Sequence, residues 1–162
     1  MKEKIKTKED LHRIVEDLKK KGKRIVFTNG CFDLLHLGHI RYLEKAKTLG
    51  DILVVGVNSD HSVQNLKGPK RPILPEEERA EILSGFGCVD YITIFDEEDP
   101  LELISTLQPD ILVKGGAWTK ETTVGREVVE RSGGEVVILP FVERASTSNI
   151  IDTILKRYEK RT

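Results

Sequence analysis

Short apolar runs alternate with helix-like segments along the chain, and this alternation constrains the fold more than any other feature. The run at 52–57 has the unbroken apolar character of a strand buried on both faces of a sheet. Strands that alternate with helices form parallel sheets with right-handed crossovers. We therefore predict an α/β fold with a doubly wound, five-stranded parallel sheet and helices on both faces. The expected strands are 24–28, 52–57, 91–95, 111–114 and 135–139.

The segments between these strands have helical periodicity and recognisable ends. Thr7 and Asp10 resemble a capping box, and Pro75 precedes three glutamates, which suit a helix N-terminus. A polar loop is expected at 58–74. We predict one domain over 1–162. The expected helices are 7–20 within an N-terminal segment 1–20, 36–49, one that begins at Pro75, 100–107, 124–131, and a C-terminal helix at 146–160.

Composition excludes several function classes. A net charge of −1 over 162 residues gives no basic field for nucleic acid. No apolar run approaches the roughly 20 residues of a membrane span, and the charged start Met1–Lys4 is unlike a signal peptide. Two cysteines make no disulfide framework. We expect a cytoplasmic protein that binds neither nucleic acid nor membrane.

His36 and His39 are the leading candidates for chemistry. They sit three residues apart on the first turn of a predicted helix, after the first strand, so both imidazoles share one face. Free backbone N–H groups and the positive end of the helix dipole favour an anion there. Gly38 would let a ligand approach the backbone. Two histidines with Cys31 nearby also resemble part of a zinc site, but no further ligand stands at recognisable spacing.

Other polar residues follow the strand ends at the same predicted edge. Thr28 and Asn29 could donate to phosphate, although turn chemistry explains Asn29 equally well. Asp33 is either a turn residue or a magnesium ligand, directly or through water. Arg71 could grip phosphate with two donors, while the roles of Lys67 and Lys70 stay open.

Two later segments complete the expected site. Lys114, Gly115 and Gly116 close the fourth strand, where the lysine could contact the acceptor phosphate or the α-phosphate of a nucleotide; Trp118 could stack on a base or sugar, or simply lie on the surface. After the fifth strand, one hydroxyl of the run 146–148 would cap a helix. Capping alone does not account for three hydroxyls and an arginine. We predict a second anion site from Arg144, Ser146, Thr147 and Ser148.

These motifs resemble a known family. His36-Leu37-Gly38-His39 is similar to the HxGH signature of the nucleotidylyltransferase superfamily, and Ser146-Thr147-Ser148 to its second signature. Further segments resemble the heptose 1-phosphate adenylyltransferases of lipopolysaccharide core synthesis. These are Thr28-Asn29-Gly30-Cys31-Phe32-Asp33, 57–60, 66–69, 71–73, 109–116, 124–125 and 133–134.

The resemblance implies a Rossmann-like fold and a specific reaction. ATP and D-glycero-D-manno-heptose 1-phosphate would give ADP-heptose and pyrophosphate, with Mg²⁺ bridging the phosphates. It implies catalytic roles for His36, His39, Arg71 and Lys114. The implied nucleotide-binding residues are Thr28, Asn29, Gly30, Cys31, Phe32, Gly38, Gly115, Gly116, Arg144, Ser146, Thr147 and Ser148.

The resemblance also bears on partners and alternatives. In many members this domain is fused behind a sugar kinase, and this sequence contains no kinase segment. We therefore expect a stand-alone form, a homodimer linked in function to a separate heptose 7-phosphate kinase. Asn149 stands where glycerol-phosphate cytidylyltransferases carry lysine, which argues against that relative. Transfer of a cytidylyl group to glycerol 3-phosphate or another polyol phosphate remains the alternative reaction. A non-catalytic nucleotide sensor and a metal or redox protein are the other classes considered.

Overall fold

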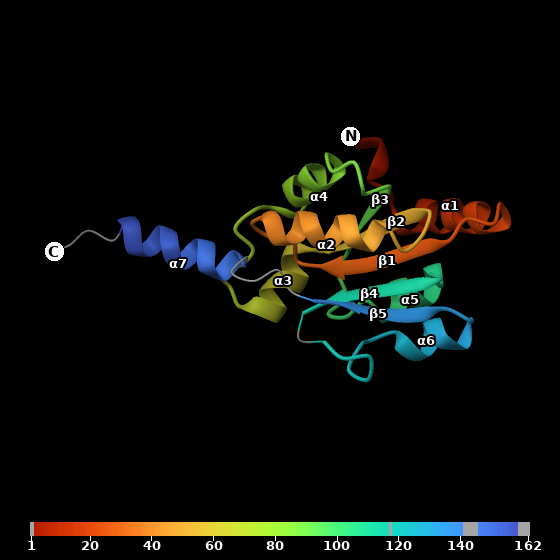
Figure 1. Ribbon diagram of the computed structural model, residues 1–162. Helices are drawn as coiled ribbons and strands as arrows, with labels where there is room; N and C mark the ends of the chain where they lie inside the picture. Colours follow the sequence, from red (N-terminus) through yellow and green to blue (C-terminus); the bar gives the residue numbers. More distant parts are fainter. Residues whose placement is uncertain (1, 117, 141–145, 159–162) are drawn as a thin grey trace.

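The computed structural model describes residues 2–116, 118–140 and 146–158. Thirteen elements follow one another along these ranges (Figure 1). The strands are β1 (Ile25–Gly30), β2 (Ile52–Asn58), β3 (Tyr91–Phe95), β4 (Ile111–Gly115) and β5 (Glu135–Leu139). The helices are η1 (Lys2–Lys4), α1 (Lys8–Lys20), α2 (Leu37–Lys47), α3 (Asp60–Lys67), α4 (Glu76–Ser84), α5 (Leu101–Leu107), α6 (Arg126–Arg131) and α7 (Thr147–Tyr158).

The strands form one parallel sheet in the order β3-β2-β1-β4-β5. The chain winds outward from β1 to β3 and then returns to place β4 on the other side of β1. The predicted doubly wound, five-stranded Rossmann-like sheet is confirmed. The switch in winding direction lies between β1 and β4, where ligands of such sheets bind.

Apolar side chains bury both faces of the sheet in two clusters. Leu43 of α2 and Leu83 of α4 pack on one face. Leu11 of α1, Ile104 of α5 and Val129 of α6 pack on the other. The helices therefore cover both faces, as the unbroken apolar character of the strands predicts. None of the helices in the described part of the chain is both long and apolar enough to span a membrane.

Two sequence expectations need correction. The segment 58–74 is not all loop, because α3 forms within it: Ser59 accepts a hydrogen bond from the Ser62 N–H at 3.0 Å and Val63 is buried. The Gly and Pro residues that suggested a loop all follow α3. His36 is the residue before α2 rather than part of its first turn, with an extended backbone (φ −143°).

Candidate active site

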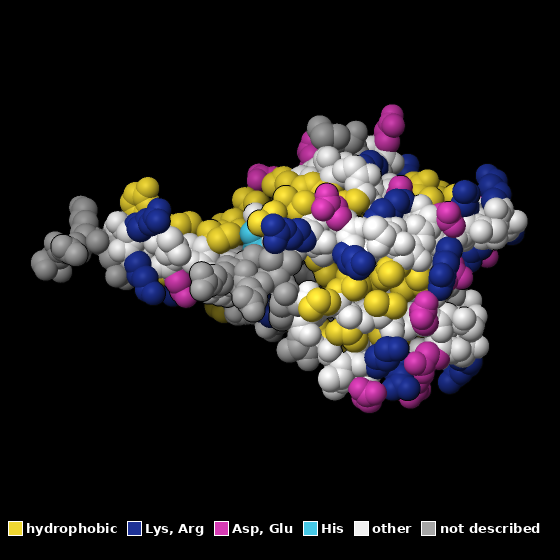
Figure 2. Space-filling view, in the orientation of Figure 1, with side chains coloured by type: hydrophobic (Ala, Val, Ile, Leu, Met, Phe, Trp, Pro, Cys, Tyr) yellow, Lys and Arg dark blue, Asp and Glu magenta, His cyan; other side chains and the backbone are white. Residues whose placement is uncertain are grey.

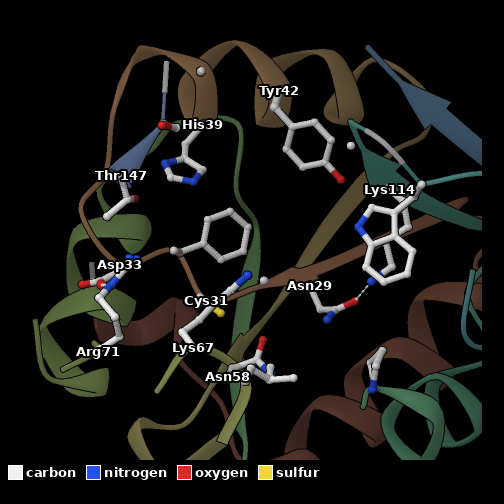
Figure 3. A pocket seen from close by; sticks show the side chains of 18 of the residues that line it. Asn29, Cys31, Asp33, His39, Tyr42, Asn58, Lys67, Arg71, Lys114 and Thr147 are labelled. Atoms are coloured by element: carbon white, nitrogen blue, oxygen red, sulfur yellow. Dashed lines mark hydrogen bonds and ion pairs between the residues drawn. The ribbon is translucent and has the colours of Figure 1, made fainter. Parts of the chain in front are cut away.

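A cavity of about 630 Å³ opens at the carboxyl edge of the sheet, across the switch point (Figure 3). The described pairing of β1 with β4 stops at Phe27 and Leu112, whereas β1 continues to Gly30 and β4 to Gly115. The strand ends therefore separate and leave space between them. The polar lining includes Asn29, Asp33, His36, His39, Asn58, Lys67, Arg71, Glu98, Asp99, Lys114, Ser146, Thr147 and Ser148.

The two histidines form a stacked pair on the cavity wall. Their ring centroids are 3.8 Å apart with an interplanar angle of 25°. Burial and the neighbouring His36 lower the pKa of His39 to about 4, and burial lowers the pKa of His36. The backbone N–H of His36 donates to Nδ1 of His39 at 3.4 Å. Because Nδ1 accepts, the proton of this neutral imidazole lies on Nε2, which makes His39 a hydrogen-bond donor.

Asp33 organises the loop that carries Arg71. Its carboxylate accepts from Nε of Arg71 and from the backbone N–H groups of Ile73 at 2.8 Å and Leu74 at 3.2 Å. The terminal groups of the Arg71 guanidinium make no hydrogen bond within the described chain, and Arg71 lines the cavity. Asp33 thereby fixes the orientation of the Arg71 side chain on the cavity wall.

The same contacts argue against Asp33 as a metal ligand. Both carboxylate oxygens are engaged and the side chain is 1% exposed. No cluster of three or more His, Cys, Asp or Glu suited to a metal occurs in the part of the chain that the structure describes. These residues do not fit a protein-held magnesium ion.

Arg79 is a buried residue that connects three segments by hydrogen bonds, and the sequence analysis missed it. Its side chain is fully buried and donates to the carbonyl oxygens of Leu74 at 3.0 Å and of Cys31, and to Oδ1 of Asp60 at 2.8 Å. It therefore joins the loop after β1, the loop before α4 and the start of α3. The sequence did contain one signal. Arg79 lies one residue before Ala80 and four before Leu83, which places it on the buried face of α4.

Lys114 and Asn29 meet across the separated ends of β4 and β1. Nζ of Lys114 donates to Oδ1 of Asn29 and lies 5.7 Å from the centroid of the Trp118 ring. Burial lowers the pKa of Lys114 to about 8. Lys114 is 8% exposed, and its nearly buried amine points toward Asn29 on the cavity wall (Figure 3).

Thr28 lies beneath the cavity instead of on its wall. It is fully buried, and its hydroxyl is 2.7 Å from the hydroxyl of Tyr42, which also donates to the carbonyl of Val113 at 3.1 Å. Burial raises the pKa of Tyr42 to about 12. Tyr42 thus fills the gap where β1 and β4 part, and Thr28 supports it. Sequence analysis did not single out Tyr42.

The second predicted anion segment reaches the same cavity. Ser146, Thr147 and Ser148 line it, and the Thr147 hydroxyl donates to the carbonyl of Leu34 at 3.1 Å. Ser146 accepts from the Asn149 N–H at 3.0 Å, so one hydroxyl caps α7 as expected. Arg144 lies outside the described residues. Segments more than 100 residues apart therefore converge beside the histidines.

The remaining predicted residues divide into two groups. Gly30, Cys31, Phe32, Gly38, Gly115 and Lys67 line the cavity. Gly116, whose φ is +82°, and Lys70 are not part of its lining. Burial raises the pKa of the Cys31 thiol. The lining also includes Asn58, the last residue of β2, and Glu98 and Asp99, which follow β3. Asn58 belongs to the segment 57–60 that carries the family resemblance but was not among the predicted site residues, and Glu98 and Asp99 stand in no recognisable motif.

The sequence is similar to a known family and to known proteins. A family model described as cytidylyltransferase-like matches residues 27–156. "Bifunctional protein HldE" of Syntrophotalea carbinolica is 56% identical over 97% of the chain, and that of Geotalea uraniireducens is 59% identical over 93%. The chain spans about a third of the length of these relatives, 32% and 31% respectively.

Two solved structures are also similar to this chain. A lipopolysaccharide core biosynthesis protein from Thermoplasma volcanium is 32% identical, with a TM-score of 0.63. The match covers 76% of this chain and 100% of that protein. A pantoate-beta-alanine ligase from Francisella tularensis, 18% identical with a TM-score of 0.66, matches over 96% of this chain and 77% of its own, and shares the fold.

Proposed function

Because the chain belongs to the cytidylyltransferase-like family of nucleotidyltransferases, we propose that it transfers an adenylyl group from ATP to a heptose 1-phosphate. The products are pyrophosphate and ADP-heptose, and the ADP-heptose serves as a precursor for the lipopolysaccharide core. One observation carries the proposal: the stacked histidines and the hydroxyls of 146–148 converge in one cavity beside Arg71 and Lys114. High identity to the HldE proteins and the Thermoplasma structure support the choice of substrate class.

The reaction needs positioning more than acid–base chemistry. A phosphate monoester has a second pKa of ~6, so the attacking oxygen of the sugar phosphate is largely anionic at neutral pH. It attacks the α-phosphorus of ATP, a new P–O bond forms, and the bond to the β-phosphate oxygen breaks as pyrophosphate leaves. Preorganised donors stabilise the charge that develops on the transferring and leaving groups.

Each wall of the cavity suits a different part of the substrates. His36 and His39 would donate to the phosphate undergoing transfer, and Arg71, Ser146 and Thr147 would hold the β- and γ-phosphates. Lys114, at the end of β4 beside Asn29, would contact the acceptor phosphate. Magnesium would enter with ATP as the counterion of its phosphates, since Asp33 has no free oxygen for a metal.

The two sides of the switch point differ in polarity. Gly115, Trp118 and Pro140, which carry no ionisable side chain, line the cavity beside β4 and β5, and the Trp118 ring suits stacking with adenine. Asn58, Glu98 and Asp99 lie on the β2–β3 side. Carboxylates repel a triphosphate but accept hydrogen bonds from hydroxyl groups. We therefore place the heptose on this side, across the cavity from Gly115.

Pyrophosphate release tests the proposal. Each of the four common nucleoside triphosphates is paired with a panel of sugar and polyol phosphates. We expect ATP with a heptose 1-phosphate to give the highest kcat/KM. Preference for CTP with glycerol 3-phosphate would overturn the substrate assignment. No release with any pair would overturn the activity itself.

Two variants test the placement of the substrates. Glu98→Gln should raise KM for the sugar phosphate and leave KM for ATP unchanged. Trp118→Ala should have the reverse effect, because an aromatic platform for the base is lost. If both variants change the two KM values in parallel, the assignment of the walls is wrong.

A further inference from the structure

A hydrogen bond between two side chains joins β1 and β4 where their backbones part. The last backbone-paired residues of these strands in the described chain are Phe27 and Leu112. Continued by two residues, the same register would place Asn29 opposite Lys114. Alternate residues of a strand point to the same face of a sheet, so the two side chains project together. Nζ of Lys114 donates to Oδ1 of Asn29 and spans the gap (Figure 3).

Neighbouring residues restrict both partners of this bond. Gly56 of β2 lies beside Asn29 in the sheet, and a Cβ atom at Gly56 would be only 3.2 Å from Cβ of Asn29. The glycine therefore lets β2 approach Asn29 closely. On the other strand, Tyr42 donates to the carbonyl of Val113 at 3.1 Å, which holds the backbone directly before Lys114. The amine and the amide thus meet at a defined position.

The hydrogen-bond partner of Lys114 carries no charge. On the face of the molecule in Figure 2, Lys and Arg side chains lie among Asp and Glu side chains. Several of them form ion pairs, such as Lys47 with Asp90 and Arg24 with Glu135. The ammonium of Lys114 instead donates to an amide, and burial lowers its pKa to about 8. Its positive charge is therefore not compensated by a bonded carboxylate.

Other ionisable groups of the cavity leave this charge in place. Tyr42 is neutral because burial raises its pKa to about 12. The carboxylate of Asp33 is bound to Arg71, and the stacked histidines are neutral. Glu98 and Asp99 line the cavity, and neither forms an ion pair with the ammonium in the part of the chain that the structure describes. An anion that enters the cavity can therefore take the free charge.

An amide partner suits an ammonium that must bind an incoming phosphate. An ammonium has three N–H donors, and the contact with Asn29 uses one of them. We propose that Asn29 is a positioning residue of the acceptor site, which holds the Lys114 ammonium in one orientation and leaves its charge for the phosphate of the sugar. An aspartate at position 29 would form an ion pair and repel that phosphate. This role rests on the proposed adenylyl transfer, in which Lys114 contacts the acceptor phosphate.

The titration of the Lys114 amine tests the contact without turnover. It is followed by NMR of protein with isotope-labelled lysine, and the signal is assigned by its loss in Lys114→Met. Asn29→Asp should raise the pKa of Lys114 by roughly one to three pH units, as an opposite charge at this distance does. Asn65→Asp adds the same charge on the exposed side of α3, outside the cavity lining, and should leave the pKa unchanged. An unchanged pKa in Asn29→Asp would overturn the proposal.

Steady-state kinetics test whether Asn29 acts through Lys114. Asn29→Ala should raise KM for heptose 1-phosphate roughly 3- to 10-fold, the range for one hydrogen bond, and change KM for ATP much less. In the Lys114→Met background the same change should have little further effect, because residues in direct contact are not additive. An equal effect of Asn29→Ala with and without the lysine would make Asn29 merely structural and overturn the proposal.

The pH profile distinguishes the charge from the contact. In Asn29→Asp, KM for heptose 1-phosphate should be high at pH 7 and should no longer rise between pH 7 and 9, because the paired ammonium stays protonated. In Asn29→Ala the rise should persist. A rise in Asn29→Asp like that of the unaltered enzyme would contradict the proposal. If no pair of substrates is turned over, the proposed function fails, whereas the NMR titration still decides the role of Asn29.

Discussion

His39 acts as a neutral donor in the free protein, which sets its expected mutational behaviour. We predict that His39→Ala lowers kcat by ~10²–10³, the usual loss for one preorganised donor, with a smaller effect on ATP affinity, since charge on the phosphates peaks in the transition state. His39→Gln, whose amide nitrogen can reach the position of Nε2, should retain more activity. Steady-state kinetics of the three proteins provides the measurement. An unchanged kcat in the alanine variant would remove His39 from the mechanism.

The lowered pKa of His39 also has a consequence for stability. Its pKa is about 4 in the folded protein against an ordinary 6.5, so between these values the unfolded chain binds the extra proton. The contribution is therefore fully favourable above pH 6.5 and is lost as pH falls toward 4. Urea unfolding at pH 7 and pH 5 should show a larger loss of stability in the unaltered protein than in His39→Gln. Equal losses would contradict the burial of a neutral imidazole.

Lys114 should make acceptor binding depend on pH. Burial lowers its pKa to about 8, so the amine loses its charge as pH rises through that value. We predict that KM for the sugar phosphate rises between pH 7 and 9, more than KM for ATP. Lys114→Met should show a high KM at every pH, and Lys114→Arg should flatten the profile. Lys70→Met, outside the cavity lining, is the matched control; the same pH profile in Lys114→Arg would exclude Lys114 as its source.

At the scale of elements, the loop 71–74 is held in place by hydrogen bonds to the Asp33 carboxylate. We predict that Asp33→Asn weakens ATP binding about 10-fold, or about 1.4 kcal/mol, which is close to the lower limit of roughly 1.5 kcal/mol for one hydrogen bond to a charged group. The magnesium concentration that half-saturates activity should not change. Calorimetry and a magnesium titration give the two values. A shifted magnesium midpoint would make Asp33 a metal ligand after all. Asp51→Asn, where the carboxylate accepts from the Arg24 N–H, is the control.

The start of α7 provides a second prediction at this scale. Thr147→Val keeps the shape of the side chain and removes the hydroxyl that donates to Leu34. We expect weaker ATP binding, in the same direction as Arg71→Ala, because both residues are assigned to the β- and γ-phosphates. Thr153→Val, which removes a hydroxyl bonded only to the Asn149 carbonyl in the described chain, should leave affinity unchanged. Unchanged calorimetric affinity in Thr147→Val and Arg71→Ala would show that the second anion site is misplaced.

At the scale of the whole molecule, the cavity joins segments from the two halves of the chain. Ser146, Thr147 and Ser148 line it together with His36 and His39. The hydroxyl of Thr147 donates to the carbonyl of Leu34, so the position of this wall depends on how the start of α7 is seated against the loop after β1.

Local pattern was sufficient for most of the architecture. The expected bounds of 91–95 and 135–139 agree with β3 and β5, and Thr7 caps α1 through the Asp10 N–H at 3.1 Å. Apolar periodicity, helix caps and Gly or Pro residues at the ends of elements depend on a few neighbouring residues. They can therefore be recognised in the sequence without knowledge of the fold. The parallel orientation of the strands followed from the alternation of elements alone, whereas their order in the sheet came from the structure.

Contacts between segments that are far apart in the sequence could not be predicted from local pattern. The chain contains no local sign that Asp33 accepts from Ile73 and Leu74, or that Arg79 joins Cys31, Leu74 and Asp60. A buried charge requires partners, but which partners it finds depends on how loops from different strands meet. For the same reason the spacing of His36 and His39 predicted an anion site, while its neutral histidines, its engaged aspartate and its carboxylate wall emerged only in the folded chain.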